Sequence, residues 1–210
     1  KKSECVGENK ELENIPRDFY RRCVSEAGFL NWCQYDKVSK FLLKADKVYE
    51  SQEFNGSIAK SQNLINGYIL DFVRKNPHTE FHFAISAYST FYYRVQVDDG
   101  YTPNPKQHLD KWGKILKWLV NEGQNLPNMK IYGFDDLELT NNTNNYIDHG
   151  HYRIGYPLNS IALDSIRNKK HILTPQNIDK YLATMEQKIK NYDLAPLIAE
   201  IKQWEANHKR

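Results

Sequence analysis

A helix that ends at a proline-containing turn and leads into a short apolar strand occurs twice in this 210-residue chain. The first helix covers 58–75, is stopped by Asn76-Pro77 and is followed by the apolar run 81–85. The second helix covers about 105–121 and precedes the apolar run 129–134. Strands alternate with helices in this way when the strands are parallel and the helices connect them. The order therefore predicts an α/β fold with a parallel sheet.

The helices are predicted from apolar residues that recur at helical spacing. In the first helix these residues are Ile58, Leu64, Ile65, Tyr68, Ile69, Phe72 and Val73. Three further helices are expected at 157–167, after Thr174-Pro175 and at about 194–206. Thr174 is predicted as the N-cap of the second of these, with Pro175 at its first helical position.

Only two strands are predicted with this reasoning, and two strands make a poor sheet. Either further strands escape detection, or part of the sheet lies outside this chain. We divide the chain into a polar and partly helical N-terminal segment, residues 1–50, and an α/β domain, residues 51–210.

Composition excludes several classes of protein. The formal charge of +3, from 29 Lys+Arg and 26 Asp+Glu, is too small to indicate nucleic acid as a partner. No run of about 18 apolar residues exists, so no membrane span is expected. Cys23 and Cys33 would pair in an oxidising compartment, but buried free thiols are an equal alternative.

The densest group of ionisable residues is Asp148-His149-Gly150-His151-Tyr152. A carboxylate three residues before a histidine can bond Nδ1 of the ring and stabilise the imidazolium that forms during catalysis. A purely structural hydrogen bond is the alternative to catalysis. A site for zinc or another divalent metal, formed by Asp148, His149 and His151 with His82, is a second alternative, but the side chains of His-Gly-His do not readily face one ion. We therefore expect no metal and no cofactor.

No Gly-x-Ser-x-Gly or Gly-Asp-Ser motif supplies a nucleophile. Ser86 and Ser89 follow the first strand, where binding and catalytic groups gather in open α/β sheets. The alternative is that both hydroxyls bond the backbone of a tight loop. Aromatic residues that could stack on a sugar ring, or pack in the core, follow the same strand. They are Tyr88, Phe91, Tyr92, Tyr93 and Tyr101.

Several short motifs between about Ile58 and Asn191 follow one another in an order and spacing that a known protein family shares. They are Asn76-Pro77, Ala87-Tyr88-Ser89, Thr143-Asn144-Asn145-Tyr146, Asp148-x-x-His151-Tyr152 and Thr174-Pro175-Gln176-Asn177-Ile178-Asp179. In this order and spacing the chain resembles part of the SGNH/GDSL-like hydrolase superfamily, and most of all bacterial proteins of the cell envelope.

The resemblance implies a three-layer sandwich with a parallel sheet, of the flavodoxin-like SGNH type. It also implies that Asp148 and His151 are catalytic, with His151 as the general base, and that Tyr88, Ser89 and Tyr152 bind substrate. The family's nucleophilic serine lies upstream and has no match in these 210 residues. The chain therefore resembles the C-terminal part of such a protein, without its first strand.

The function implied by the resemblance is that of an O-acyl esterase or acyltransferase acting on a cell-surface polysaccharide. The implied location is the bacterial cell envelope or the secreted fraction. An N-terminal fragment or a partner would complete the sheet. The alternative is a non-catalytic carbohydrate-binding or scaffold module that keeps the fold.

Overall fold

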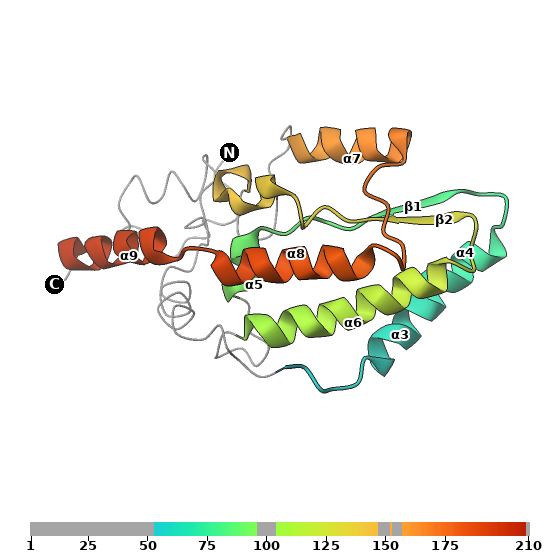
Figure 1. Cartoon of the computed structure of the whole chain (residues 1–210), viewed down its shortest axis with the longest axis horizontal. Coiled ribbons are helices and arrows are strands. Elements are labelled where there is room, and N and C mark those ends of the chain that lie inside the picture. Colours follow the sequence, from blue (N-terminus) through green and yellow to red (C-terminus); the bar gives the residue numbers. More distant parts are fainter. Residues whose placement is uncertain (1–52, 96–103, 147–151, 153–156, 209–210) are drawn as a thin grey trace, which may run out of the picture.

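The computed structural model describes residues 53–95, 104–146, 152 and 157–208 (Figure 1). Over these residues the chain is a mixed α/β protein, mostly helical, with one two-stranded parallel sheet. The predicted α/β class and the parallel direction of the strands are confirmed. The N-terminal segment and the three cysteines lie outside the described residues.

The sheet consists of β1 (Phe81–Ala84) and β2 (Met129–Tyr132), with Phe81 opposite Met129. Successive side chains of a strand point to opposite faces, so Ile131 and Tyr132 enter two different clusters. The backbone of Tyr132 also forms an isolated antiparallel bridge with Ile172 on the other edge of β2. Among the described residues, β1 pairs only with β2.

The helix that precedes β1 is one continuous helical run, as its apolar spacing predicts. It consists of α3 (Ala59–Ile65), the π-helical η3 (Asn66–Leu70) and α4 (Asp71–Lys75). It ends at Asn76, because the residue before a proline is biased away from the helical conformation. Leu70 and Val73 are the residues that this run buries.

The long helix between the two strands is α6 (Pro105–Gly123), which starts as predicted and ends two residues later. Its N-cap is Asn104, whose side-chain oxygen accepts a hydrogen bond from the Gln107 N–H at 3.0 Å. Pro105 occupies the first turn, where the missing N–H costs no hydrogen bond.

The remaining elements are all helical. They are α5 (Thr90–Val95), η4 (Glu138–Asn141), η5 (Thr143–Asn145), α7 (Pro157–Asn168), α8 (Ile178–Asn191) and α9 (Ala195–His208). Of these, α5 lies between β1 and α6, and the others follow β2. The short helix α5 has no counterpart in the sequence-based assignment. Within the described ranges, no helix is long and apolar enough to cross a membrane.

The predicted start of α8 is wrong by three residues. Thr174 is not an N-cap; its carbonyl oxygen accepts hydrogen bonds from the N–H groups of Asn177 and Ile178. The Asn177 side chain accepts from the Thr174 N–H and donates to the Ile172 carbonyl. These bonds hold 174–177 in a turn, so the helix begins only at Ile178.

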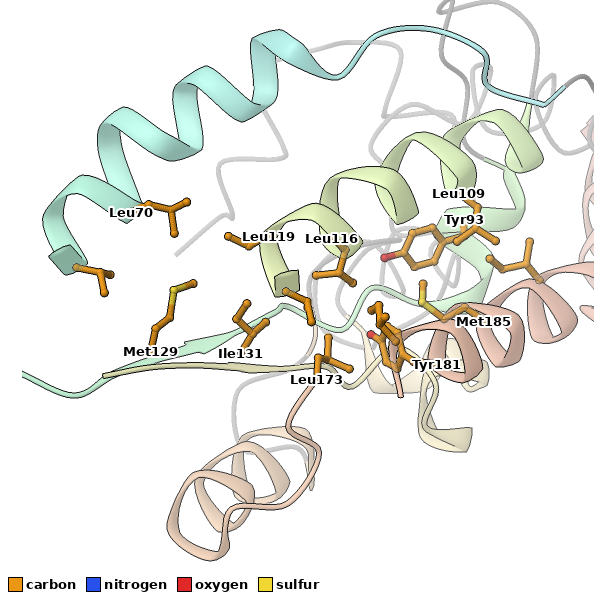
Figure 2. Close-up of a cluster of buried hydrophobic side chains, with 14 residues drawn as sticks. Leu70, Tyr93, Leu109, Leu116, Leu119, Met129, Ile131, Leu173, Tyr181 and Met185 are labelled. Atoms are coloured by element: carbon orange, nitrogen blue, oxygen red, sulfur yellow. The ribbon is translucent and has the colours of Figure 1, made fainter. Parts of the chain in front are cut away.

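Helices cover both faces of the sheet (Figure 1). The larger buried cluster lies between the sheet and the helices α4, α6 and α8 (Figure 2), and Leu116, Ile131 and Met185 are among its members. On the opposite face, Leu158 of α7 packs against Tyr132. Both faces of the sheet are covered, with β2 mostly buried and β1 half-buried up to the exposed Ala84, which agrees with the mainly apolar sequence of the strands.

Candidate functional site

The sequence-predicted site residues that the structure describes gather around the carboxyl end of β1. Tyr88 and Ser89 lie in the turn that connects β1 to α5, and Tyr152 pairs with Tyr146 in an isolated antiparallel bridge. The predicted catalytic residues Asp148 and His151 lie outside the described residues.

Tyr146 connects the bridge to the turn after β1. Its hydroxyl donates a hydrogen bond to the Ala87 carbonyl oxygen at 3.0 Å, and the side chain is buried. Burial raises the pKa of Tyr146 above its ordinary value, so the hydroxyl stays protonated and remains a donor. The described residues that flank 147–151 are therefore fixed beside Ala87.

Ser89 is completely buried, and its hydroxyl oxygen accepts a hydrogen bond from the Tyr92 N–H at 3.0 Å. This is the capping role that the sequence leaves open for a serine at a strand end. Its role in substrate binding stays a prediction. Ser86, three residues earlier, is exposed.

Asp135, which sequence reasoning missed, organises the same end of the sheet. It is buried and accepts hydrogen bonds from the Tyr88 N–H (3.0 Å), the Tyr93 hydroxyl (3.0 Å) and the Tyr181 hydroxyl (2.8 Å). Burial raises the pKa of Asp135 to about 6, although the three hydrogen bonds and the charge of Lys188 act in the opposite direction. One carboxylate thus joins the turn after β1, α5, the end of β2 and α8.

Lys188 of α8 extends this arrangement behind the strand ends. Its Nζ donates hydrogen bonds to the backbone oxygens of Asp135 and Leu137 and, at 2.6 Å, to Thr140 Oγ1. Burial lowers the pKa of Lys188. We refer to Asp135, Tyr88, Tyr93, Tyr181 and Lys188 as the Asp135 network.

The sequence does contain a signal for this network. Asp135 and Asp136 directly follow the apolar run 129–134, at the strand edge where functional groups of α/β proteins collect. The signal is positional, however, because the residues that bond Asp135 come from segments more than 40 positions away.

A cavity of about 460 Å³ opens beside the Asp135 network, between the turn after β1, α5 and α6. The rings of Tyr88 and Tyr92 line it and stack on each other, with centroids 4.5 Å apart and an interplanar angle of 20°. Trp112 also lines it, and its buried indole N–H has no hydrogen-bond partner in the structure described here. We call it the aromatic cavity.

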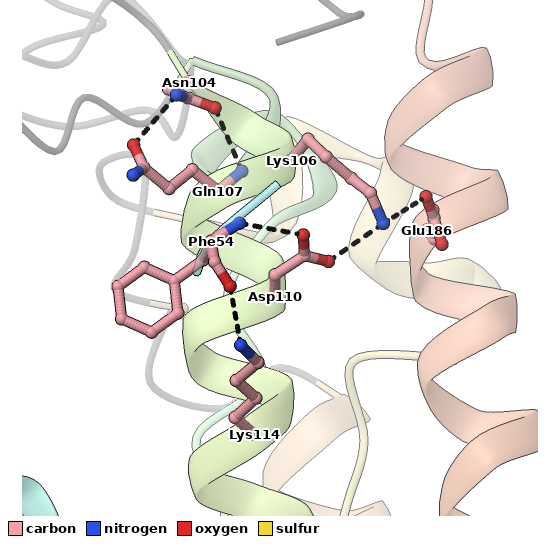
Figure 3. A network of polar contacts seen from close by, with 7 residues as sticks. All are labelled: Phe54, Asn104, Lys106, Gln107, Asp110, Lys114 and Glu186. Atoms are coloured by element: carbon pink, nitrogen blue, oxygen red, sulfur yellow. Dashed lines mark hydrogen bonds and ion pairs between the residues drawn. The ribbon is translucent and has the colours of Figure 1, made fainter. Parts of the chain in front are cut away.

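A second cavity, of about 510 Å³, lies beside Phe54 on the other side of α6. There Lys106 contacts Asp110 and Glu186, each at 2.9 Å, and Asp110 accepts from the Phe54 N–H at 3.3 Å (Figure 3). Lys114 donates to the Phe54 carbonyl oxygen at 2.6 Å. These five residues, which we call the Lys106 network, tie the start of the described chain and α8 to α6.

Metal ligands do not cluster in the described part of the chain: no group of three or more His, Cys, Asp or Glu residues could hold an ion there. Of the metal alternative considered from sequence, Asp148, His149 and His151 lie outside the described residues. His82 lies within them, and its ring is hydrogen-bonded to the Tyr132 hydroxyl at 3.0 Å.

Comparison of the sequence with protein-family models found no match, and comparisons with curated proteins and with solved structures found none either. The functional argument therefore depends on the residues of this chain.

Proposed function

We propose that this chain is the C-terminal part of an SGNH/GDSL-like O-acyl esterase or acyltransferase that acts on a cell-surface polysaccharide of bacteria. His151 is the general base, and Asp148 orients and stabilises its ring. A serine that this chain does not identify forms the acyl-enzyme, and backbone amides hold the oxyanion. The site of action is the cell envelope or the extracellular medium.

The bridge between Tyr146 and Tyr152 is the observation that carries this proposal. These two residues flank the motif, and the Tyr146 hydroxyl bonds Ala87 at the end of β1. Only five residues, 147–151, connect the two tyrosines. The proposal assigns the acid–base pair to the strand edge at which α/β enzymes place their active sites.

The aromatic cavity supports a sugar as the substrate. Flat aromatic rings bury the apolar face of a sugar ring while their hydroxyl groups remain available for hydrogen bonds. Tyr88 lines this cavity. In the proposal, Tyr88, Ser89 and Tyr152 bind the substrate, with Ser89 acting through the turn that it caps.

The proposed fold is the three-layer, flavodoxin-like sandwich without its first strand. Two features support an additional strand or partner: β1 has a single neighbour in the described structure, and the helical run before it exposes an apolar stripe. Leu64, Tyr68 and Phe72 form this stripe at i, i+4 and i+8 and are 50%, 80% and 59% exposed. An N-terminal fragment or partner would cover the stripe and complete the sheet.

The test is acetate release from an O-acetylated polysaccharide by the full-length polypeptide that contains this chain. His151→Ala should lower turnover on the order of 10²-fold or more, because proton transfer by a positioned base is lost. Asp148→Asn should lower it as well. His149→Ala, two positions away, is the matched control and should leave turnover unchanged.

Equal turnover in His151→Ala and in the unmodified protein would remove His151 from the mechanism. If the unmodified protein binds the polysaccharide but releases no acetate, the non-catalytic carbohydrate-binding module is the correct assignment. The stacked tyrosines of the aromatic cavity are the observation that favours this second function.

A further inference from the structure

The aromatic cavity has a chemical character that distinguishes it from the cavity beside Phe54. The charged or hydrogen-bonding side chains that line it include Ser86, His108, Lys111 and Trp112, and no described Asp or Glu is among them. The lining of the cavity beside Phe54 includes four acidic residues, Glu53, Asp110, Asp179 and Glu186, and only two lysines, Lys114 and Lys117. Of these two cavities, the aromatic one is therefore suited to an electron-rich or negatively charged group.

The indole N–H of Trp112 gives the strongest indication that an acceptor belongs in this place. Its Nε1 atom is buried and has no hydrogen-bond partner in the part of the chain that the structure describes. An indole N–H can only donate, and a buried donor without a partner is unfavourable. A ligand oxygen in the cavity beside Trp112 would supply the missing acceptor.

Lys111, the neighbour of Trp112 on α6, adds a positive charge to the same wall. It lines the cavity and is exposed, and its Nζ lies 5.8 Å from the centroid of the Phe54 ring. A lysine at this position can move toward an anion without losing an ion pair to another described residue, because Lys111 forms none within the described part of the chain. The wall therefore presents one fixed donor and one adaptable cation.

The rest of the lining is largely aromatic. Tyr88 and Tyr92 stack with centroids 4.5 Å apart, and the His108 ring stands edge-on to Tyr92 with centroids 6.0 Å apart. The position of Tyr88 is fixed, because its N–H donates to the buried carboxylate of Asp135. A ring that enters the cavity meets a preformed surface.

We propose that the aromatic cavity binds an acidic sugar of the uronic-acid class, with its ring against Tyr88 and Tyr92 and its carboxylate toward Trp112 and Lys111. This inference rests on the proposed function, which supplies a polysaccharide as the natural ligand. The inference adds that this polysaccharide is acidic. A cavity of about 460 Å³ is large enough for one or two sugar rings.

The test compares two probes that differ only in charge: a trimer of galacturonic acid and the same trimer with its carboxyl groups reduced to alcohols. Binding to the full chain is measured by isothermal titration calorimetry at low ionic strength. The acidic trimer should bind at least tenfold more tightly than the reduced trimer.

Two variants and one control locate the site. Lys111→Glu should weaken binding of the acidic trimer tenfold or more and leave the reduced trimer unaffected, because only the charge contact is reversed. Trp112→Phe keeps an aromatic ring but removes the donor, and it should weaken the acidic trimer more than the reduced one. Lys202→Glu makes the same charge change at an exposed position of α9 and should have no effect.

Equal affinity for the two trimers, absence of binding, or insensitivity to Lys111→Glu would each overturn the inference. These outcomes are distinct from failure of the proposed function. Selective binding of the acidic trimer without acetate release would keep the inference and reject the esterase. Acetate release without any preference for acidic polysaccharide would do the reverse.

Discussion

The Asp135 network and the Lys106 network both use a lysine and a carboxylate to attach α8 to the rest of the fold, yet they differ in environment. In the Lys106 network opposite charges touch, and the side chains of Lys106 and Asp110 are 22% and 20% exposed. Burial alone would lower the pKa of Lys106, but its bonds to Asp110 and Glu186 outweigh burial and raise it.

The Asp135 network instead buries a carboxylate among neutral donors, and there the cost of burial raises the pKa of the acid. Such an arrangement is stable only while every donor is used. The comparison teaches that the ion pairs hold segments together, whereas the buried carboxylate fixes Tyr88 and thereby shapes the aromatic cavity. The two networks should therefore respond differently to substitution, pH and salt.

Removal of the buried carboxylate should have the largest effect. Asp135→Ala leaves the Tyr88 N–H and the hydroxyls of Tyr93 and Tyr181 without their acceptor. We expect a loss of about 3–5 kcal/mol in the free energy of unfolding, measured by urea denaturation. Asp110→Ala in the Lys106 network is the control and should cost only about 1 kcal/mol or less. Equal losses would show that the two networks are energetically alike.

The pH dependence of stability should also separate the networks. Because the pKa of Asp135 rises from 3.8 to about 6 in the folded chain, the folded state binds more protons than the unfolded state between these values. The contribution to stability is complete below about pH 4 and is lost as the pH rises through about 6. It amounts to roughly 2–3 kcal/mol. Tyr93 and Tyr181, whose pKa values are raised, and Lys188 are the titratable groups that face Asp135.

The measurement is urea denaturation of the unmodified chain and of Asp135→Asn between pH 4.5 and about 7.5. Asn keeps the shape and most of the hydrogen bonds, so the stability advantage of the unmodified chain should shrink as the pH rises. Asp164→Asn is the control: Lys170 lowers the pKa of the exposed Asp164 below its ordinary value of 3.8, so both folded and unfolded states are ionised here over this pH range, and the difference from the unmodified chain should stay constant. A pH-independent difference between Asp135→Asn and the unmodified chain would contradict a raised pKa at Asp135.

Gly133 offers a way to disturb the Asp135 network without touching its polar atoms. A Cβ at this position would lie 2.8 Å from ring carbons of Tyr181 and 2.9 Å from Leu173. Gly133→Ala should therefore displace the Tyr181 ring and cost about 1–3 kcal/mol, seen in urea denaturation and in the near-ultraviolet dichroism of the tyrosines.

Gly67→Ala is the matched control, since a Cβ there meets nothing within 4 Å. Alanine is the better helix former, so Gly67→Ala should raise stability by up to about 1 kcal/mol. If the Gly133→Ala variant were as stable as the unmodified chain, the position of the Tyr181 ring would not contribute to stability.

Much of the fold was predictable because its signals are local. The apolar spacing of 58–75 and the proline turn after it predict both the helix and its end. The start of α8 was predicted wrongly, because the Asn177 side chain bonds two backbone groups and delays the helix. The helix α5 was missed because its aromatic residues are equally typical of a loop or a core.

The candidate site was predictable only in part, because only some of its residues carry a local sequence signal. Tyr88 was singled out from its place after a strand, and it does line the aromatic cavity. Asp135 was missed because its importance comes from Tyr93 and Tyr181, which reach it from 42 and 46 positions away. Such partners are set by tertiary packing, which apolar spacing does not encode.

Neutralising Lys106 should have the smallest effect of all. Lys106→Met keeps much of the hydrocarbon stem but removes the contacts to Asp110 and Glu186, so we expect a loss of about 1 kcal/mol or less. Because these side chains are partly exposed, salt screens their charges, and the difference from the unmodified chain should shrink between about 0.05 and 1 M salt. The effect of Asp135→Ala, which removes buried hydrogen bonds, should persist over the same range in urea denaturation. If Lys106→Met caused a large loss in the free energy of unfolding that salt did not change, Lys106 would contribute to stability as Asp135 does. The distinction between partly exposed ion pairs and a buried hydrogen-bond acceptor would then be wrong.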